Sequence, residues 1–328
     1  MKMWMIRFVL VSACLLGGCQ EKASNLADLD QESPLDIVLE NDVDQEEKNE
    51  QQIQPVRVTI TDPRTLELVT SITPQELAYE TDFDLYQEKI QELAKQLARG
   101  TNTSSGYDQT MVLDKIGDDG QIIKGNPRVI LKESELVEKI LAASKDGGNV
   151  DLPLYVTESN YKSEDIPFLN EVTIASFTTY FKAADIGRSK NIELSANALD
   201  HILVGDGDYF SFNTMVGERT EERGYQPALE IINQEYVMGI GGGICQTSST
   251  LFNAVDQLGV KMTERHHHSL SIGYVPAGRD ATVSYGTLDF KFQNSSGAPF
   301  LIRTMYLDGV LTVEIRTAQK YEAMFNEG

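Results

Sequence analysis

Apolar side chains recur along residues 54–157 at the spacings of two helices and several short strands. The first helix is predicted by a repeat of three to four residues that stops before Gly100 and contains Phe83, Leu85, Ile90, Leu93 and Leu97. A second helix is expected to start at Ser134, whose hydroxyl can cap it, and to end at Gly147. Residues rich in β-formers predict strands at 56–60, 67–72 and 151–156.

The pattern from residue 166 onward predicts a second set of elements. A strand at 173–181 is followed by a helix at 188–204, which would carry His201 as a structural residue. Alternating residues then predict four strands, at 281–285, 288–293, 300–306 and 310–316. Asp308 and Gly309 indicate a hairpin with a type I′ turn, in which both central residues have positive φ. The fold class is therefore α+β, with a largely antiparallel sheet.

A glycine-rich loop comes before another predicted helix. Four of the five residues from 239 to 243 are glycine, and Leu251, Ala254, Val255 and Leu258 mark the helix that begins near Cys245. No Lys-Ser or Lys-Thr pair follows the loop, as a phosphate-binding P-loop would require. We therefore expect the glycines to serve the helix and the cysteine that begins it.

The net charge of the chain argues against one class of binding partner. The 328 residues include 28 Lys and Arg against 50 Asp and Glu, which gives a formal net charge of −22. Binding to nucleic acid depends on Lys and Arg that neutralise phosphates, so this balance argues against a nucleic-acid partner. The stretch from residue 20 to residue 50 is acidic and has no aromatic side chain. We expect residues 19–53 to be a disordered acidic linker.

The N-terminus has the features of an export signal. Lys2 and Arg7 come before the apolar residues 8–16, a segment too short for a permanent transmembrane helix. The sequence Leu16-Gly17-Gly18-Cys19 resembles the bacterial lipobox, in which the cysteine is lipidated and becomes the new N-terminus. This predicts a signal peptide at residues 1–18 and a protein held by lipid at the extracytoplasmic face of the cell membrane. An ordinary signal peptide is the alternative.

Cysteine usage points to reactivity. Of the three cysteines, Cys14 would leave with the signal and Cys19 would carry lipid, so Cys245 would be the one unmodified thiol. A thiol at a helix N-terminus faces unpaired backbone N–H groups and the positive end of the helix dipole, and both favour thiolate. These N–H groups are also able to form an oxyanion hole. A buried, inert cysteine is the alternative.

Three consecutive histidines, His266 to His268, follow the predicted cysteine helix. If a strand continues through them, His266 and His268 point to one face and one of them can act as a base for Cys245. Asp280 or Asp289 would orient that imidazole. A zinc site formed by Cys245 with His266 and His268 is an alternative, but its spacing matches no standard finger. We expect neither a metal nor another cofactor.

Several motifs together resemble the VanW family. They run in the family's order from residue 172 to residue 316 and comprise residues 174–179, 210–213, 216–220, 241–246, 265–269, 274–278 and 280–283. The preceding region is similar to a peptidoglycan-binding domain that often comes before VanW domains. The resemblance divides the chain into a peptidoglycan-binding domain at 54–165, a VanW domain at 166–318 and a tail at 319–328.

The resemblance implies a role in the cell wall of a Gram-positive bacterium. Some VanW proteins have been linked to L,D-transpeptidation, in which a cysteine attacks an amide of a peptidoglycan stem peptide and passes the acyl group to the amine of another. It implies Cys245 as nucleophile, His268 as base, Asp280 as orienter, and backbone N–H groups of Gly242, Gly243 and Cys245 as oxyanion hole. It also implies that the substrate is contacted by Arg219, Arg265, Gln246, Ser269 and Tyr274. The two arginines would bind carboxylates of the substrate.

Two other functions remain open at this stage. One is a non-catalytic peptidoglycan-binding or scaffold lipoprotein, linked to glycopeptide resistance or wall maintenance and to wall-synthesis proteins as partners. The other is a cysteine peptidase or amidase of stem peptides, in which water replaces the amine. Hydrolysis and transfer share the same acyl-enzyme, so sequence does not separate them.

Overall fold

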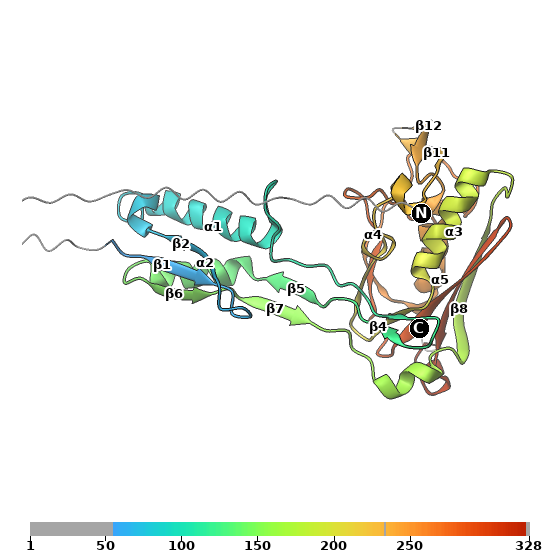
Figure 1. The fold of residues 1–328 in the computed structure, drawn as a ribbon, viewed down its shortest axis with the longest axis horizontal. Coiled ribbons are helices and arrows are strands. Elements are labelled where there is room, and N and C mark those ends of the chain that lie inside the picture. Colours follow the sequence, from blue (N-terminus) through green and yellow to red (C-terminus); the bar gives the residue numbers. More distant parts are fainter. Residues whose placement is uncertain (1–54, 233, 326–328) are drawn as a thin grey trace, which may run out of the picture. The chain divides into compact units, whose positions relative to one another are not determined.

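The computed structural model describes residues 55–232 and 234–325 (Figure 1). The predicted signal peptide, Cys19 and the acidic linker lie outside these residues. In the part of the chain that is described, no helix is both long and apolar enough to cross a bilayer.

Two helices cover a small sheet in the N-terminal part of the described chain (Figure 1). Helix α1 (Phe83–Arg99) begins where the Asp82 carboxylate accepts a hydrogen bond from the Leu85 backbone N–H, and it ends before Gly100, which has a φ of 82°. Its buried side chains recur every fourth residue and pack with helix α2 (Glu133–Ala143) in one core. The sheet has the order β2 (Leu68–Ile72), β1 (Val58–Thr61), β6 (Gly148–Asp151).

Local details of this region differ from prediction. Helix α1 is confirmed, but Ser134 is not the cap of α2, because the helix already begins at Glu133. The strand predicted at 151–156 is divided at Leu152 and Pro153 into β6 and β7 (Leu154–Thr157). Strand β7 pairs with β5 (Arg128–Leu131) rather than with β1. Proline lacks a backbone N–H, and this favours a break in the ladder.

A six-stranded antiparallel sheet organises the C-terminal part. Its order is β4 (Ile122–Ile123), β3 (Lys115–Ile116), β9 (Ile202–Val204), β15 (Phe300–Leu307), β16 (Val310–Thr317), β8 (Val172–Tyr180). Helices α3 (Ile186–Leu199) and α5 (Ile244–Val255) pack against each other and against this sheet (Figure 1).

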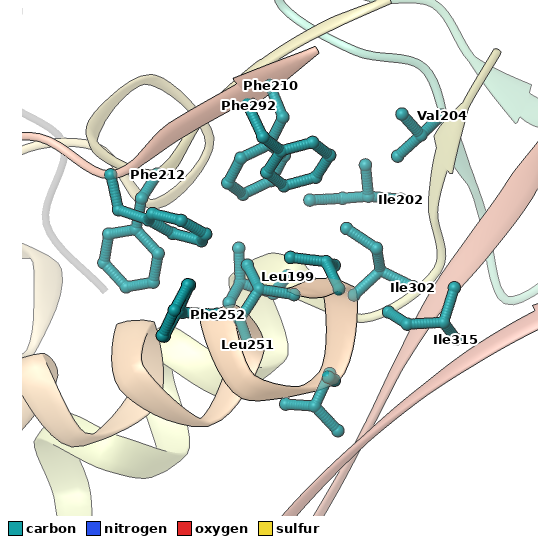
Figure 2. Close-up of a cluster of buried hydrophobic side chains, with 14 of the residues drawn as sticks. Leu199, Ile202, Val204, Phe210, Phe212, Leu251, Phe252, Phe292, Ile302 and Ile315 are labelled. Atoms are coloured by element: carbon teal, nitrogen blue, oxygen red, sulfur yellow. The ribbon is translucent and has the colours of Figure 1, made fainter. Parts of the chain in front are cut away.

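The main core lies between α5, this sheet and a second, smaller sheet. Figure 2 shows Leu251 and Phe252 of α5 in one buried cluster with Ile302 and Ile315 of the large sheet and Phe292 of the small one. The small sheet has the order β10 (Tyr209–Ser211), β14 (Lys291–Gln293), β13 (Lys261–Glu264). Helix α5 is therefore held on two sides, and the residue that begins it is fixed in space.

The remaining elements are short. Strands β11 (Pro227–Ile232) and β12 (Glu235–Ile240) form a separate two-stranded hairpin that leads into α5. The other helical segments are α4 (Phe212–Val216), α6 (Glu322–Phe325) and 3-10 turns at Pro74–Leu77, Ser163–Phe168, Glu221–Arg223, Asp256–Leu258 and Gln319–Tyr321.

The predicted α+β class with largely antiparallel sheets is confirmed, with changes at three places. The helix expected to reach Val204 ends at Leu199, and His201, with a φ of 64°, turns the chain into β9. The hairpin at Asp308 and Gly309 is confirmed, but only Gly309 has positive φ, so the turn is not type I′. The stretch 281–285 forms isolated bridges instead of a strand.

The segment 111–123 joins the N-terminal region to the large sheet. Met111 and Leu113 are buried in the main core, and β3 pairs with β9. All described residues fall in one compact unit. The division into domains at residues 165 and 166 stays a prediction.

Candidate active site

The glycine loop places Cys245 as the second residue of helix α5. Gly241 and Gly243 have φ values of 98° and 108°, which L-residues with side chains rarely adopt. At Gly242 a Cβ atom would lie 2.5 Å from the carbonyl oxygen of Ala228. Glycine is therefore needed for both the turn and the close packing that place Cys245 at the N-terminus of the helix.

Cys245 is half-buried as a residue, and its thiol has polar neighbours from the segment that follows Asp280. Its sulfur lies 3.4 Å from the Thr282 hydroxyl oxygen, and the Val283 backbone N–H donates to it at 3.5 Å. Hydrogen-bond donors around sulfur stabilise a thiolate more than a thiol. The surroundings therefore favour the reactive form.

His268 is fixed by Asp280. One carboxylate oxygen of Asp280 accepts both the His268 backbone N–H at 2.6 Å and the His268 Nδ1–H at 2.7 Å. The two side chains are only 7% and 8% exposed, and the Tyr274 ring packs edge-on to the imidazole. Because Nδ1 is bound to the carboxylate, Nε2 is the ring atom left for proton exchange with the thiol.

The pKa values of these groups shift in the directions of an ion pair. Burial raises the pKa of Cys245, but the hydrogen bond and charge of His268 outweigh it, so the pKa is lowered. Burial lowers the pKa of His268, but the hydrogen bonds and charges of Cys245 and then of Asp280 outweigh this effect, so the pKa is raised. Burial also raises the pKa of Asp280, and hydrogen bonds from His267 and His268 bring it down to about 2. The arrangement therefore favours thiolate and imidazolium over the neutral pair.

The histidine run does not follow the alternation of a strand. Strand β13 ends at Glu264, and His267 Nδ1, like His268 Nδ1, reaches Asp280 at 2.7 Å. His266 instead bonds Glu264 at 2.9 Å and does not line the cavity that contains Cys245. Within residues 55–232 and 234–325, no group of three His, Cys, Asp or Glu side chains could hold a metal ion. Asp289, the alternative orienter, binds Ser211 and Asn213 instead.

Backbone N–H groups remain open beside the thiol. Ile244 and Gln246 donate their N–H groups to Gly241 and Gly243, respectively. In the described structure, the N–H groups of Gly242, Gly243 and Cys245 donate no hydrogen bond. Open donors at a helix N-terminus are suited to stabilise an oxyanion.

A cavity of about 650 Å³ opens at the thiol. Its walls come from α3, the β11–β12 hairpin, the glycine loop and the segments that carry His268 and Tyr285. Arg188, Gln246 and Tyr274 line it, and Arg188 donates to the Gln246 side-chain oxygen at 2.8 Å. Burial, and next the negative charge of Cys245, raise the pKa of Tyr274, so that its phenol remains protonated.

Arg219 also lines this cavity and lacks a protein acceptor. Its guanidinium carbon lies 5.6 Å from the centre of the Phe212 ring and 5.7 Å from that of Tyr285. Both terminal nitrogens are buried, and neither has a hydrogen-bond partner among the described atoms. Burial lowers the pKa of Arg219, and the charge of Tyr225 and then that of Cys245 oppose this. An unpaired buried guanidinium is costly, and an anion in the cavity would supply the acceptor that the described residues do not.

The structure separates the predicted substrate contacts into two groups. The cavity contains Gly242, Gly243, Gln246, Arg219 and Tyr274. Arg265 and Ser269 do not line the cavity. The Arg265 guanidinium donates to the Gly278 carbonyl oxygen and lies 4.3 Å from the centre of the Phe252 ring. The Ser269 hydroxyl oxygen accepts the backbone N–H of Gln234, at the tip of the hairpin.

Sequence reasoning missed several residues of the site. Thr282 and Val283 contact the sulfur, Arg188 supports Gln246, and the hairpin supplies Leu229 and Ile231 to the wall. These residues are ordinary in type and distant from Cys245 in the chain. The one signal for any of them was the family motif at residues 280–283, which follows the histidines and contains Thr282 and Val283.

Comparisons with known proteins agree on a family. A family profile described as "VanW like protein" matches residues 187–316. The chain is 39% identical over 202 residues to "Uncharacterized protein YoaR" of Bacillus subtilis, an alignment that covers 61% of this chain and 67% of the relative. The chain belongs to the VanW family.

A second relative carries a functional name. The chain is 26% identical over 140 residues to "Vancomycin B-type resistance protein VanW" of Enterococcus faecalis, covering 41% of this chain and 51% of that protein. No solved structure matches the chain. The part matched by the VanW profile contains Cys245, His268 and Asp280, so the candidate site lies within the family region.

Proposed function

We propose that this VanW protein is a cysteine-dependent acyltransferase that acts on peptidoglycan stem peptides. The observation that carries the proposal is the arrangement of Cys245 at a helix N-terminus with His268, which Asp280 orients, at the wall of an open cavity. A nucleophile, a base and a group that orients the base are the parts of covalent acyl transfer. The vancomycin-resistance name of one relative supports a cell-wall substrate.

The two half-reactions balance on these residues. The Cys245 thiolate attacks the amide carbonyl of the donor, and the open N–H groups of the glycine loop stabilise the oxyanion. His268 Nε2 gives its proton to the departing amine, which leaves a thioester on Cys245. The amine of a second stem peptide then attacks the thioester and passes a proton to His268, so an amide forms and the thiolate returns. Water in place of this amine would make the protein a hydrolase.

Mass spectrometry tests this proposal directly. Full-length protein in detergent is incubated with tetrapeptide muropeptides, with Cys245→Ala as the matched variant. We expect an acyl group on Cys245 in the wild type alone, together with cross-linked peptides. Shortened peptides without cross-links would show a hydrolase. If folded wild-type protein leaves the muropeptides unchanged, the non-catalytic wall-binding function replaces the proposal.

We further propose that lipid on Cys19 holds the protein at the extracytoplasmic face of the membrane. The support is the lipobox-like sequence that ends at Cys19. Cys19→Ala should shift the protein from the membrane fraction of whole cells or leave its signal uncleaved. An unchanged membrane fraction and an unchanged N-terminal mass would contradict lipidation.

A further inference from the structure

In the part of the chain that the structure describes, strand β11 has a neighbouring strand on one side only. The β11–β12 sheet has two strands, and the hydrogen bond from Gly241 N–H to the Gln226 carbonyl shows which residue pairs are bonded across it. Bonded pairs alternate along an antiparallel ladder, so Leu229 and Ile231, which oppose Met238 and Tyr236, belong to non-bonded pairs. Their backbone N–H and C=O groups therefore point away from β12.

This free edge borders the thiol cavity. Leu229, Glu230 and Ile231 line it in succession, whereas β12 contributes only Tyr236 and Ile240, which lie on one face of that strand. Consecutive residues on both faces of a strand can line one space when the strand presents its edge to it. We therefore place the edge of β11 toward the cavity.

Contacts at the start of β11 agree with this orientation. Pro227 is also in a non-bonded pair, and a Cβ atom on Gly187 would lie 2.4 Å from its carbonyl oxygen. The N-terminus of α3 is therefore on the outer side of β11. The next residue of α3, Arg188, packs against Gly243, where a Cβ atom would meet Arg188 Cγ at 2.8 Å. The outer side of β11 is thus the side of the cysteine loop.

The outward groups of this edge have no partner in the described part of the chain. No hydrogen bond outside the β11–β12 ladder involves the backbone of Leu229 or Ile231. Backbone groups that border a cavity gain by pairing, and an extended peptide offers donors and acceptors at the spacing of a strand. An occupant of this edge would therefore be recognised through the hydrogen bonds of its own backbone.

We propose that β11 is the docking strand for the donor peptide, which adds to the hairpin as a third strand along Leu229 and Ile231. This mode, β-augmentation, uses main-chain hydrogen bonds for affinity. A peptide bound there extends from the hairpin toward the glycine loop, because β12 leads directly into that loop and Cys245. The inference rests on the proposed function and adds how its substrate is held.

Proline substitution tests the edge with a matched control. Leu229 and Met238 oppose each other in the same non-bonded pair, so proline at either position removes an outward N–H and spares the ladder. Of these two residues, Leu229 lines the cavity and Met238 does not. In a Cys245→Ala background, Leu229→Pro should weaken binding of a tetrapeptide muropeptide about tenfold, and Met238→Pro should leave the Kd within about twofold.

A second control separates backbone from side chain. Leu229→Ala keeps the N–H and should bind more tightly than Leu229→Pro. Calorimetry gives the Kd values, and circular dichroism shows whether each variant is folded. Equal affinity of the two folded proline variants would overturn the inference, as would muropeptide that binds none of the proteins.

Failure of the inference is distinguishable from failure of the proposed function. The binding experiment uses protein without the thiol, so it reports docking whether or not acyl transfer occurs. In protein that retains Cys245, the rate of alkylation by iodoacetamide should be the same in Leu229→Pro and in wild type, since this small probe needs no docking strand. A large fall in that rate would show a distorted site and would contradict a role confined to docking.

Discussion

Asp280 binds two histidines through separate oxygens, and only one of the two lies on the cavity wall. His267 is half exposed, whereas His268 is buried beside Tyr274. Hydrogen bonds from His267 and His268 outweigh burial and bring the pKa of Asp280 down to about 2, and the resulting negative charge helps to raise the pKa of His268. At this scale the contacts favour an ion pair of Cys245 and His268, supported by Asp280 as a third group.

Removal of His268 should shift the pH at which Cys245 reacts. His268 lowers the pKa of Cys245, so in His268→Ala the thiolate forms only at higher pH. We expect the iodoacetamide rate to reach half its maximum at a lower pH in wild type than in the variant. His266→Ala, whose side chain does not line the cavity, should keep the wild-type profile. Identical profiles for wild type and His268→Ala would contradict the ion pair.

Arg219 should be more important for substrate than for stability. Its terminal nitrogens have no partner among the described residues, so Arg219→Met removes a buried charge without breaking an ion pair. The variant should unfold at the wild-type temperature or above it, and should raise the KM for a peptide with a free carboxylate about tenfold. The KM for the amidated peptide should not change. A lower melting temperature with unchanged KM would show that Arg219 is structural.

At the scale of elements, the glycine loop joins the β11–β12 hairpin to α5 and so connects the proposed docking strand to the nucleophile. Helix α5 carries polar side chains at buried positions, and Gln246, Ser249 and Thr250 all have hydrogen-bond partners. Satisfied polar groups allow a helix of this composition to lie between two sheets. The position of Cys245 depends on this packing.

Alanine at Gly242 should destabilise the protein. The added methyl group would meet the Ala228 carbonyl oxygen at 2.5 Å, and backbone cannot move aside as a flexible side chain can. We expect the free energy of unfolding to fall by about 1–3 kcal/mol, measured by urea denaturation. Gly273→Ala is the control, because no atom lies within 4 Å and the residue has no positive φ. Equal stabilities would show that the loop adjusts at little cost.

At the scale of the whole molecule, the region before residue 166 contributes to the main core and to the large sheet of the VanW-like region. Met111 and Leu113 complete the main core, and β3 extends the large sheet beyond β9. The Asp114 carboxylate also accepts hydrogen bonds from Lys124 at 2.7 Å and from the Gly125 backbone at 2.8 Å. The segment is therefore part of the structure that supports the site, although it lies before the region matched by the family profile.

A fragment that begins at residue 166 should be less stable than one that begins at residue 108. The shorter fragment loses Met111 and Leu113, and burial of one large aliphatic side chain contributes about 2 kcal/mol. We expect a lower melting temperature by circular dichroism and greater binding of a hydrophobic dye. Equal melting temperatures would show that the segment contributes nothing to the C-terminal core.

Local pattern was sufficient to predict much of the framework. The repeat from Phe83 to Leu97 predicted α1, and the β-rich residues around Asp308 and Gly309 predicted the β15–β16 hairpin. The glycines before Cys245 predicted a helix that starts at the thiol. These features depend on neighbours in the chain, so the physical cause is present in the sequence itself.

Tertiary structure decided what local pattern left open. Local pattern placed residues 202–204 in a helix, which was wrong, because pairing with β15 makes them a strand. Either Asp280 or Asp289 could orient a histidine, and the fold brought Asp280 to His268 and Asp289 to Ser211. The unpaired guanidinium of Arg219 and the free edge of β11 depend on segments distant in the chain. Sequence alone determined which groups were available, and the packing of distant segments determined which of them meet.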